Sequence, residues 1–421
     1  MDFKKLSGSL LFRIIVAIIL GIVASIIFHG SGWGETIARI FVTFNGLFGN
    51  FLGFFIPVLI FALIAPAIAS LGRGAGKWLG ITTAIAYFST IISGFIAYGI
   101  SISLYDWLLA GNSTVKVDDI DEGALQPFFE IEMPAPMDVM TALLLAFTVG
   151  LAMTAVKSDT LYRGCQDLQR VIMHVISGFI IPLLPIYIFG MFLSLGMNGN
   201  LLNTLTAFGK VLLLAVLMTW VILIAQYIIA GGIAGKNPFT ALKNMLPAYA
   251  TALGTSSSAA TIPITYAGAK KNGVTDAVAG FVIPLCATIH LSGSIQKIGL
   301  CAFAIVYMDG MEMSPGMAIG FILMLGIFMI AAPGVPGGAI MAAVGLLQSM
   351  LGFTDDQVAL MIAAYIAIDS FGTACNVTGD GAIAMVVNKF AKGDIQRTAR
   401  QEETSPLDYQ SEGTAALYEG K

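Results

Sequence analysis

Two acidic side chains stand in an otherwise apolar stretch near the end of the sequence. Asp369 and Asp380 lie in residues 364–380, which read AYIAIDSFGTACNVTGD. A charge inside a hydrophobic membrane segment is costly unless it is paired or faces a wet cavity, so such residues mark paths for ions or substrates. We therefore take this segment as the candidate functional site.

The spacing of the two carboxylates indicates that they bind different ligands. On an unbroken helix, eleven residues cover three turns and about 16 Å, so both side chains share one face but reach different ligands. Asn376 and Gly379 predict a local distortion, which would free carbonyls to bind a hard cation beside Asp380. Asp369 suits the ammonium group of a substrate; the alternative is a structural ion pair with Lys297.

The composition places the chain in a membrane. Hydrophobic residues make up 57% of the 421 positions and charged residues only 11%, which a soluble domain of this length would not keep in solution. The net charge of −4 and the few basic residues exclude a nucleic-acid partner. The four cysteines show no metal or disulfide spacing, so we interpret them as packing residues and predict no resident cofactor.

Eight apolar runs are long enough to cross a bilayer, which takes about 20 helical residues. They cover 10–28, 41–71, 78–104, 139–156, 171–195, 203–235, 275–308 and 357–388. The first resembles a signal peptide in outline, but it is long enough to span and lacks a clear cleavage site. Basic residues recur in alternate linkers, so the positive-inside rule predicts that both termini are cytoplasmic. Residues 392–421 are polar and are predicted to form a disordered cytoplasmic tail.

Two further apolar stretches do not fit this alternation as simple spans. Residues 240–268 are broken at 254–263, and residues 315–350 are broken at 332–338. Each half is too short to cross, so we expect the first stretch to enter from the cytoplasm and return, and the second to do so from outside. The alternative, kinks in ordinary helices, conflicts with the charge alternation. Two interrupted segments of opposite topology indicate a transporter site at mid-membrane.

The broken tips have the chemistry of an anion site. Small residues at 256–260 let a ligand approach the backbone, and a half-helix that begins there offers unpaired N–H groups. Residues 336–338 offer the same from the other side, with glycine flexibility suited to a gate. The alternative is that the serines donate to carbonyls of their own helix.

These motifs together resemble the dicarboxylate/amino acid:cation symporter family, which includes glutamate and neutral amino-acid transporters. The likeness rests on the serine run before Ala-Thr-Ile-Pro, the Gly-Val-Pro-Gly-Gly turn, and the aspartate followed by Asn-Val-Thr-Gly-Asp at 376–380. It runs from about residue 10 to 389. It implies an all-α membrane protein with eight transmembrane helices and two opposed re-entrant hairpins, assembled as a homotrimer.

The resemblance also implies a division of labour. Residues 1–73 and 105–200 would form a rigid scaffold with an outer loop. Residues 74–104 and 201–391 would form a transport domain that moves as an elevator.

The resemblance further implies a substrate site and a sodium site. Five residues would meet the substrate α-carboxylate: Ser257, Ser258, Val335, Gly337 and Asn376. Asp369 would bind the α-amino group, while Thr373 and Ser294 would contact the side chain. The sodium ligands would be the Asp380 carboxylate and the carbonyls of three residues, namely Cys286, His290 and Asn376. Thr288 would contribute to a second sodium site.

One departure from the family bears on the substrate. Members that take acidic substrates carry an arginine at the position of Gly372, or supply one where this chain has Ser256 and Ser370. We infer that no cation remains to pair with a second carboxylate and that Gly372 leaves room for a small side chain. This favours cation-coupled import of serine, threonine or alanine. The alternative is sodium- or proton-coupled import of glutamate, aspartate or a C4-dicarboxylate.

A second departure bears on the coupling ion. The family motif Asn-Met-Asp-Gly-Thr is replaced by HLSGS at 290–294, and Ser292 cannot supply the carboxylate of a third sodium site. We expect fewer sodium ions per cycle. His290 either couples protons or contributes only its carbonyl and packs.

Other function classes are less consistent with the sequence. An intramembrane serine hydrolase would pair Ser257 with His290, but no nucleophile elbow surrounds either residue, and no enzymatic activity is predicted. A passive channel would need a continuous pore. Short linkers indicate the plasma membrane of a prokaryote.

Overall fold

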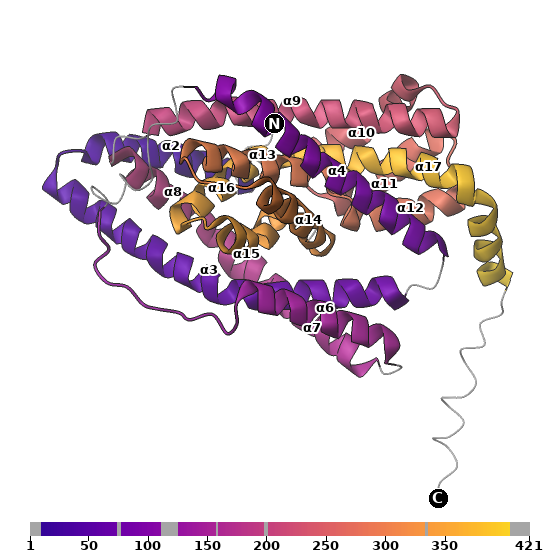
Figure 1. The fold of residues 1–421 in the computed structure, drawn as a ribbon, viewed down its shortest axis with the longest axis horizontal. Coiled ribbons are helices and arrows are strands. Elements are labelled where there is room, and N and C mark those ends of the chain that lie inside the picture. Colours follow the sequence, from indigo (N-terminus) through magenta and orange to yellow (C-terminus); the bar gives the residue numbers. More distant parts are fainter. Residues whose placement is uncertain are drawn as a thin grey trace, which may run out of the picture.

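The computed structural model describes residues 10–73, 77–110, 125–156, 159–197, 201–332 and 336–404 (Figure 1). Every regular element in these ranges is a helix, and no strand occurs in them. The first half contains α2 (Leu10–Phe28), α3 (Gly32–Arg73), α4 (Lys77–Leu108), α6 (Val139–Ala155), α7 (Thr160–Val175), the π-helix η1 (Ile176–Ile180) and α8 (Ile181–Met197). The predicted all-α class is confirmed.

The second half supplies the broken helices. It contains α9 (Leu201–Ala234), α10 (Pro238–Thr255), α11 (Ser258–Lys271), α12 (Asp276–Ile289), α13 (Ser292–Met308), α14 (Pro315–Ala331), α15 (Gly338–Leu351), α16 (Asp355–Ala367) and α17 (Asp369–Thr404). Within the described ranges, five helices are long and apolar enough to cross a membrane, or six if the bent pair α16–α17 counts as one span. Helices α2 and α6 are apolar but shorter. The chain therefore has the several apolar helices of a multi-pass membrane protein.

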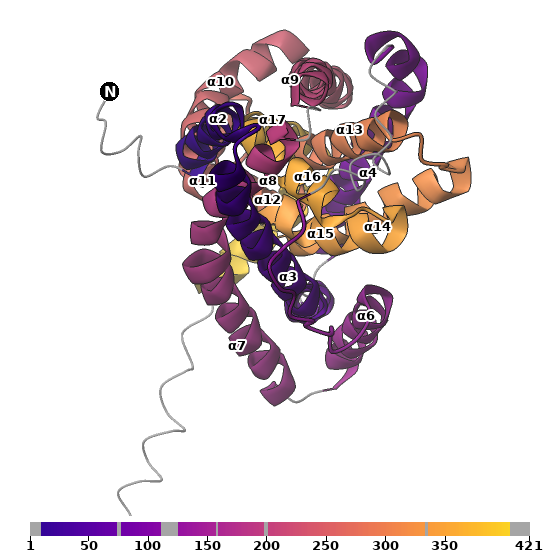
Figure 2. The same cartoon turned by 90° about the vertical axis from the view of Figure 1, so that its left-hand side faces the viewer.

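The helices form two packing groups. Helix α3 packs along α6, α7 and α8, and α2 packs on α8; Figure 1 shows α3, α6 and α7 along the lower side. In the other group α17 contacts α9, α10, α11, α12 and α13, while α4 packs on α13 and α14. Viewed from the side, α6 and α7 lie apart from α9, α10 and α13 (Figure 2). Helix α17 is thus the centre of the second group.

The two predicted breaks coincide with helix ends. Helix α10 ends at Thr255 and is followed by Ser256, which has a left-handed backbone (φ 49°), and Ser257 caps the start of α11 by accepting the N–H of Ala260 at 3.3 Å. Helix α15 begins after Gly337, also left-handed (φ 75°), a conformation that glycine adopts at little cost. The two halves of each segment pack against each other. This pairing distinguishes hairpins from kinks in a single helix.

One prediction about α17 is wrong. No distortion separates Asp369 from Asp380, because the helix is continuous there and the 59° bend lies before it, at Ile368. The helix also continues to Thr404, into the segment for which we predict a disordered tail. This segment is rich in lysine, arginine, glutamine and glutamate, which are good helix formers. Their intrinsic helix propensity accounts for the continuation of α17. Residues 405–421 of the expected tail lie outside the described ranges.

The link between α13 and α16 predicts a pH-dependent stability. Asp309, just beyond α13, accepts a hydrogen bond from Gln357 Nε2 at 2.5 Å, and burial raises the pKa of its carboxyl group to about 6. The folded protein therefore binds this proton more tightly than the unfolded chain, and stability should rise as the pH falls through about 6. We expect the melting temperature in detergent to rise by roughly 2 °C between pH 7 and pH 5.

The Asp309→Asn variant is the control for this effect, because it keeps the acceptor and removes the titration. Its melting temperature should lose this pH dependence. An equal rise in the variant would assign the effect to other groups.

Candidate functional site

Asp369 is the first residue of α17 and is only 6% exposed. Its Oδ2 accepts the backbone N–H of Gly337, at the tip of the α14–α15 hairpin, at 2.9 Å. Its Oδ1 lies 3.6 Å from Nζ of Lys297 on α13. The ion pair considered from the sequence is thus formed. The carboxylate joins three separate elements, α13, α15 and α17.

Lys297 is fully buried and stabilises the bend between α16 and α17. Its Nζ donates to the carbonyl oxygens of Ile368 at 3.1 Å and of Asp369 at 3.2 Å. It also lies 4.1 Å from the centroid of the Tyr365 ring. The Ile368 carbonyl also accepts the N–H of Phe371 at 3.1 Å, so the ammonium group is a second donor to the bend where α17 begins. The inference that no cation remains near the site is therefore wrong.

Glycines allow α13 and α17 to approach closely. A Cβ at Gly372 would overlap Cε and Nζ of Lys297. A Cβ at Gly293 would lie 2.6 Å from the Cβ of Cys375 and from the carbonyl oxygen of Gly372. The space at Gly372, which we expected to be open for a substrate side chain, is thus filled by the lysine.

A buried hydrogen-bond network surrounds Asp369. The Asn376 side chain accepts the N–H of Gly293 at 2.8 Å and donates to Ser294 Oγ at 3.0 Å. Tyr365 donates to the same hydroxyl at 3.1 Å, and Thr373 donates to the Asp369 carbonyl at 3.2 Å. These contacts hold the start of α13 against α17. Both the oxygen and the nitrogen of the Asn376 side-chain amide are engaged in these hydrogen bonds.

A second polar cluster surrounds Asp380. Its Oδ1 lies 2.9 Å from Nδ1 of His290, whose Nε2 lies 3.0 Å from Ser89 Oγ. Gln226 Nε2 donates to Ser89 Oγ at 2.9 Å and to Ser292 Oγ at 3.2 Å. The other carboxylate oxygen, Oδ2 of Asp380, is buried and has no hydrogen-bond partner in the described ranges. A buried carboxylate oxygen without a donor is suited to bind a cation.

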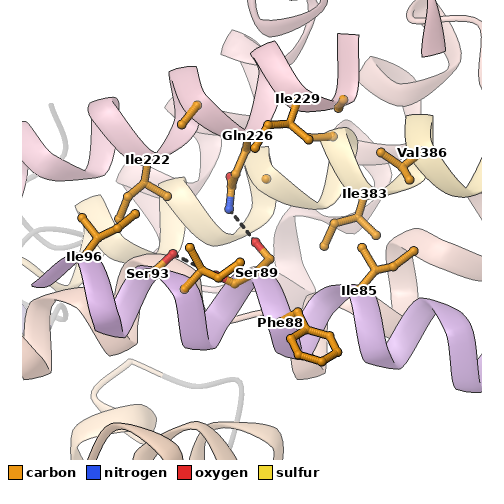
Figure 3. A pocket seen from close by; sticks show the side chains of 15 residues that line it. Ile85, Phe88, Ser89, Ser93, Ile96, Ile222, Gln226, Ile229, Ile383 and Val386 are labelled. Carbon is orange, nitrogen blue, oxygen red and sulfur yellow. Dashed lines mark hydrogen bonds between the residues drawn. The ribbon is translucent and has the colours of Figure 1, made fainter. Parts of the chain in front are cut away.

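An apolar cavity of about 310 Å³ lies beside this cluster. Helices α4, α9 and α17 line it with mostly aliphatic side chains, including Ile85, Ile229 and Ile383 (Figure 3). The hydrogen bond between Gln226 and Ser89 lies inside this lining (Figure 3). The cavity therefore leads from an exposed apolar face to the polar cluster of Asp380.

Most of the predicted site residues meet in these two clusters. The substrate group comprises Ser294, Gly337, Asp369, Gly372, Thr373 and Asn376. In the cation group, the Cys286 carbonyl accepts the N–H of His290 at 2.9 Å, and the Asn376 carbonyl lies 3.3 Å from His290 Nδ1.

Other predicted site residues are not joined to either cluster by a hydrogen bond. Thr288 is exposed and donates to the carbonyl of Leu285, and the described hydrogen bonds of Ser257 stay within its own hairpin. Ser258 begins α11 at the same tip. Val335 lies outside the described residues. The serine–histidine pair of a hydrolase is not formed here, since the ring nitrogens of His290 face Asp380 and Ser89.

Sequence reasoning overlooked three residues of the site. Gln226 is an amide in an apolar run of α9, a signal that could have been recognised. Ser89 and Tyr365 carry no comparable signal, because serine and tyrosine are common in apolar helices. Only the folded chain brings them to His290 and Lys297.

The chain is similar in sequence to one protein family and to several known proteins. A family model described as the sodium:dicarboxylate symporter family matches residues 10–390. Excitatory amino acid transporter 1 of Homo sapiens is 34% identical over 162 residues, 38% of this chain and 30% of the relative. Excitatory amino acid transporter 5 of Homo sapiens is 32% identical over 177 residues, 42% of this chain and 31% of the relative. An excitatory amino acid transporter of Caenorhabditis elegans is 32% identical over 161 residues, 38% of this chain and 32% of the relative. The matched part of the chain thus spans about a third of the length of these curated relatives.

The close approach of α13 and α17 predicts that Gly293→Ala destabilises the protein. The added methyl group must displace Cys375 or the Gly372 carbonyl, and overpacking of this kind costs about 1–3 kcal/mol. Thermal unfolding in detergent should show a lower melting temperature. Gly280→Ala is the matched control, since apart from the adjoining backbone of its own helix no described atom lies within 4 Å of its added Cβ, and it should be neutral or slightly stabilising. Equal effects of the two variants would contradict the packing argument.

Proposed function

The chain belongs to the sodium:dicarboxylate symporter family, and we propose that it is a secondary-active symporter that couples import of a small carboxylate-bearing solute to sodium. The observation that carries this proposal is that the two carboxylates of α17 have different partners. Asp369 contacts a hairpin tip and a lysine, whereas one buried oxygen of Asp380 has no hydrogen-bond partner among the residues that the structure describes. One helix thus presents a substrate group and a cation group.

The cation group of the proposal consists of Asp380 and nearby carbonyls. The sodium ligands would be Oδ2 of Asp380 with carbonyls from Cys286, His290 and Asn376, and Thr288 would serve a second site. The His290 ring already binds the other oxygen of Asp380. The imidazole occupies one oxygen of the Asp380 carboxylate, and Ser292 has no carboxylate to offer. We therefore propose that fewer sodium ions are transported per cycle than in family members with an aspartate at this position.

The hairpin tips would hold the substrate α-carboxylate. Helix α11 begins at Ser258 and α15 at Gly338, and a helix N-terminus presents unpaired N–H groups to an anion. Ser257, Ser258, Val335 and Gly337 therefore keep their proposed role. Asn376 would support this site through the start of α13.

The structure changes the balance between the two substrate classes. Two grounds favoured a neutral substrate, namely the lack of a nearby cation and the space at Gly372. Both are wrong, because Lys297 is a nearby cation and its side chain fills that space. The relatives are named for excitatory amino acids. We therefore favour an acidic amino acid or a dicarboxylate over serine, threonine or alanine.

The proposal includes an elevator mechanism in a homotrimer in the plasma membrane. Helices α2, α3, α6, α7 and α8 would be the scaffold, and α4 with α9–α17 the transport domain. The packing of α3 on α6 and of α17 on α9–α13 supports this division, and α14–α16 contact α2, α3 and α8 across it. Eight spans and two opposed re-entrant hairpins, with both termini in the cytoplasm, remain the proposed topology.

Proteoliposome uptake of radiolabelled L-aspartate tests sodium coupling. An inward sodium gradient should drive accumulation, and separately imposed proton and voltage gradients reveal other coupling. Asp380→Asn should raise the sodium concentration for half-maximal uptake at least about tenfold, because the cation loses its charged ligand. Asp276→Asn is the control, since this exposed carboxylate pairs only at the surface. Uptake that ignores sodium would refute the proposal.

Asp369→Asn should abolish uptake of any amino acid, because the substrate ammonium group loses its counter-charge. Size-exclusion chromatography in detergent should show unchanged assembly. Competition of the wild-type uptake by serine, alanine, aspartate and succinate ranks the substrate classes. Normal uptake by the variant would remove Asp369 from the site.

A further inference from the structure

We propose that Lys297 is the specificity-determining residue that selects substrates with a second carboxylate. This inference rests on the proposed symport function and assigns a role to a side chain of α13. Lys297 has no exposed area, and its Nζ lies 3.6 Å from Asp369 Oδ1. The ammonium group therefore lies beside the carboxylate that would receive the substrate amino group.

The hydrogen bonds of Lys297 leave it capacity for a further partner. An ammonium group has three N–H donors. Two of them serve the carbonyls of Ile368 and Asp369, and the 3.6 Å separation from Asp369 Oδ1 is too long for a hydrogen bond. The charged neighbour of the third donor is Asp369 Oδ1, so this donor is released when a substrate ammonium group takes over the Asp369 carboxylate. A ligand carboxylate would complete the set.

Gly372 is what allows Lys297 to occupy this place. Any side chain at position 372 would begin where Cε and Nζ of the lysine lie. A charge that enters the site from α17 at position 372 and one that enters from α13 at position 297 are therefore spatial alternatives. In this chain the charge is carried by Lys297 on α13.

The charge balance of the buried pair then sets the substrate class. Without substrate, Asp369 and Lys297 compensate each other. When a substrate ammonium group takes over Asp369, the lysine is left buried without a counter-charge, which is strongly unfavourable. An acidic amino acid supplies a partner to both groups, whereas a neutral one supplies a partner only to Asp369. The site should therefore discriminate by charge.

The Lys297→Gln variant separates this role from a structural one. Glutamine keeps an N–H donor for the carbonyls at the bend but carries no charge. In sodium-driven proteoliposome exchange, we expect the apparent affinity for L-aspartate to fall by about 100-fold or more, since a buried charge pair is lost. The affinity for L-alanine should stay the same or rise. Lys243→Gln, an exposed lysine of α10, is the matched control and should change neither.

A charge relocation provides the complementary test. In the double variant Lys297→Ala and Gly372→Arg, the smaller side chain at 297 opens the space that an arginine from α17 would fill. This variant should recover the preference for aspartate over alanine. It also tests the proposal if Lys297→Gln does not assemble, as judged by size-exclusion chromatography.

The outcomes separate this inference from the proposed function. If Lys297→Gln weakens aspartate and alanine equally, or neither, or if the relocated charge fails to restore the preference, Lys297 has only a structural role. If the wild type takes alanine but not aspartate under a sodium gradient, the inference fails while symport stands. If the wild type exchanges neither amino acid nor succinate under any gradient, the proposed function itself fails.

Discussion

The need to compensate charge inside an apolar helix bundle governs this structure. Asp369 and Lys297 are both buried, and each would be strongly unfavourable alone. Their pairing requires α13 and α17 to lie in close contact, which Gly293 and Gly372 permit. It also requires the hairpin tip at Gly337 to reach the same carboxylate. The local architecture follows from satisfying these few buried polar groups.

The backbone contributes polar groups to the candidate site at the points where helices are interrupted. The Ile368 carbonyl at the bend accepts from the lysine, and the N–H of Gly293 in the first turn of α13 donates to Asn376. The hairpin tips add two helix N-termini. An uninterrupted bundle of the same composition would present only side chains at this depth, so the breaks add backbone groups to the polar side chains of the candidate site.

Part of the site could be predicted from the sequence because it departs from the local composition. Asp369, Asp380 and the two hairpin breaks stand out against apolar surroundings, and their positions are confirmed as buried residues and helix ends. The position of the bend and the contacts of the His290 ring could not be predicted. These depend on side chains far apart in the chain, such as Lys297 with Ile368, and no local pattern encodes such pairings. The roles assigned to Ser257, Ser258 and Val335 stay predictions.

The bond between the Gly337 amide and Asp369 has one further consequence. In the proposed site, a substrate ammonium group would share the Asp369 carboxylate with that amide, so binding at the carboxylate would act directly on the tip of the second hairpin. Gly337 presents its N–H from a left-handed backbone (φ 75°), which other residues adopt only at a cost. The contact between hairpin and carboxylate therefore depends on glycine at this position.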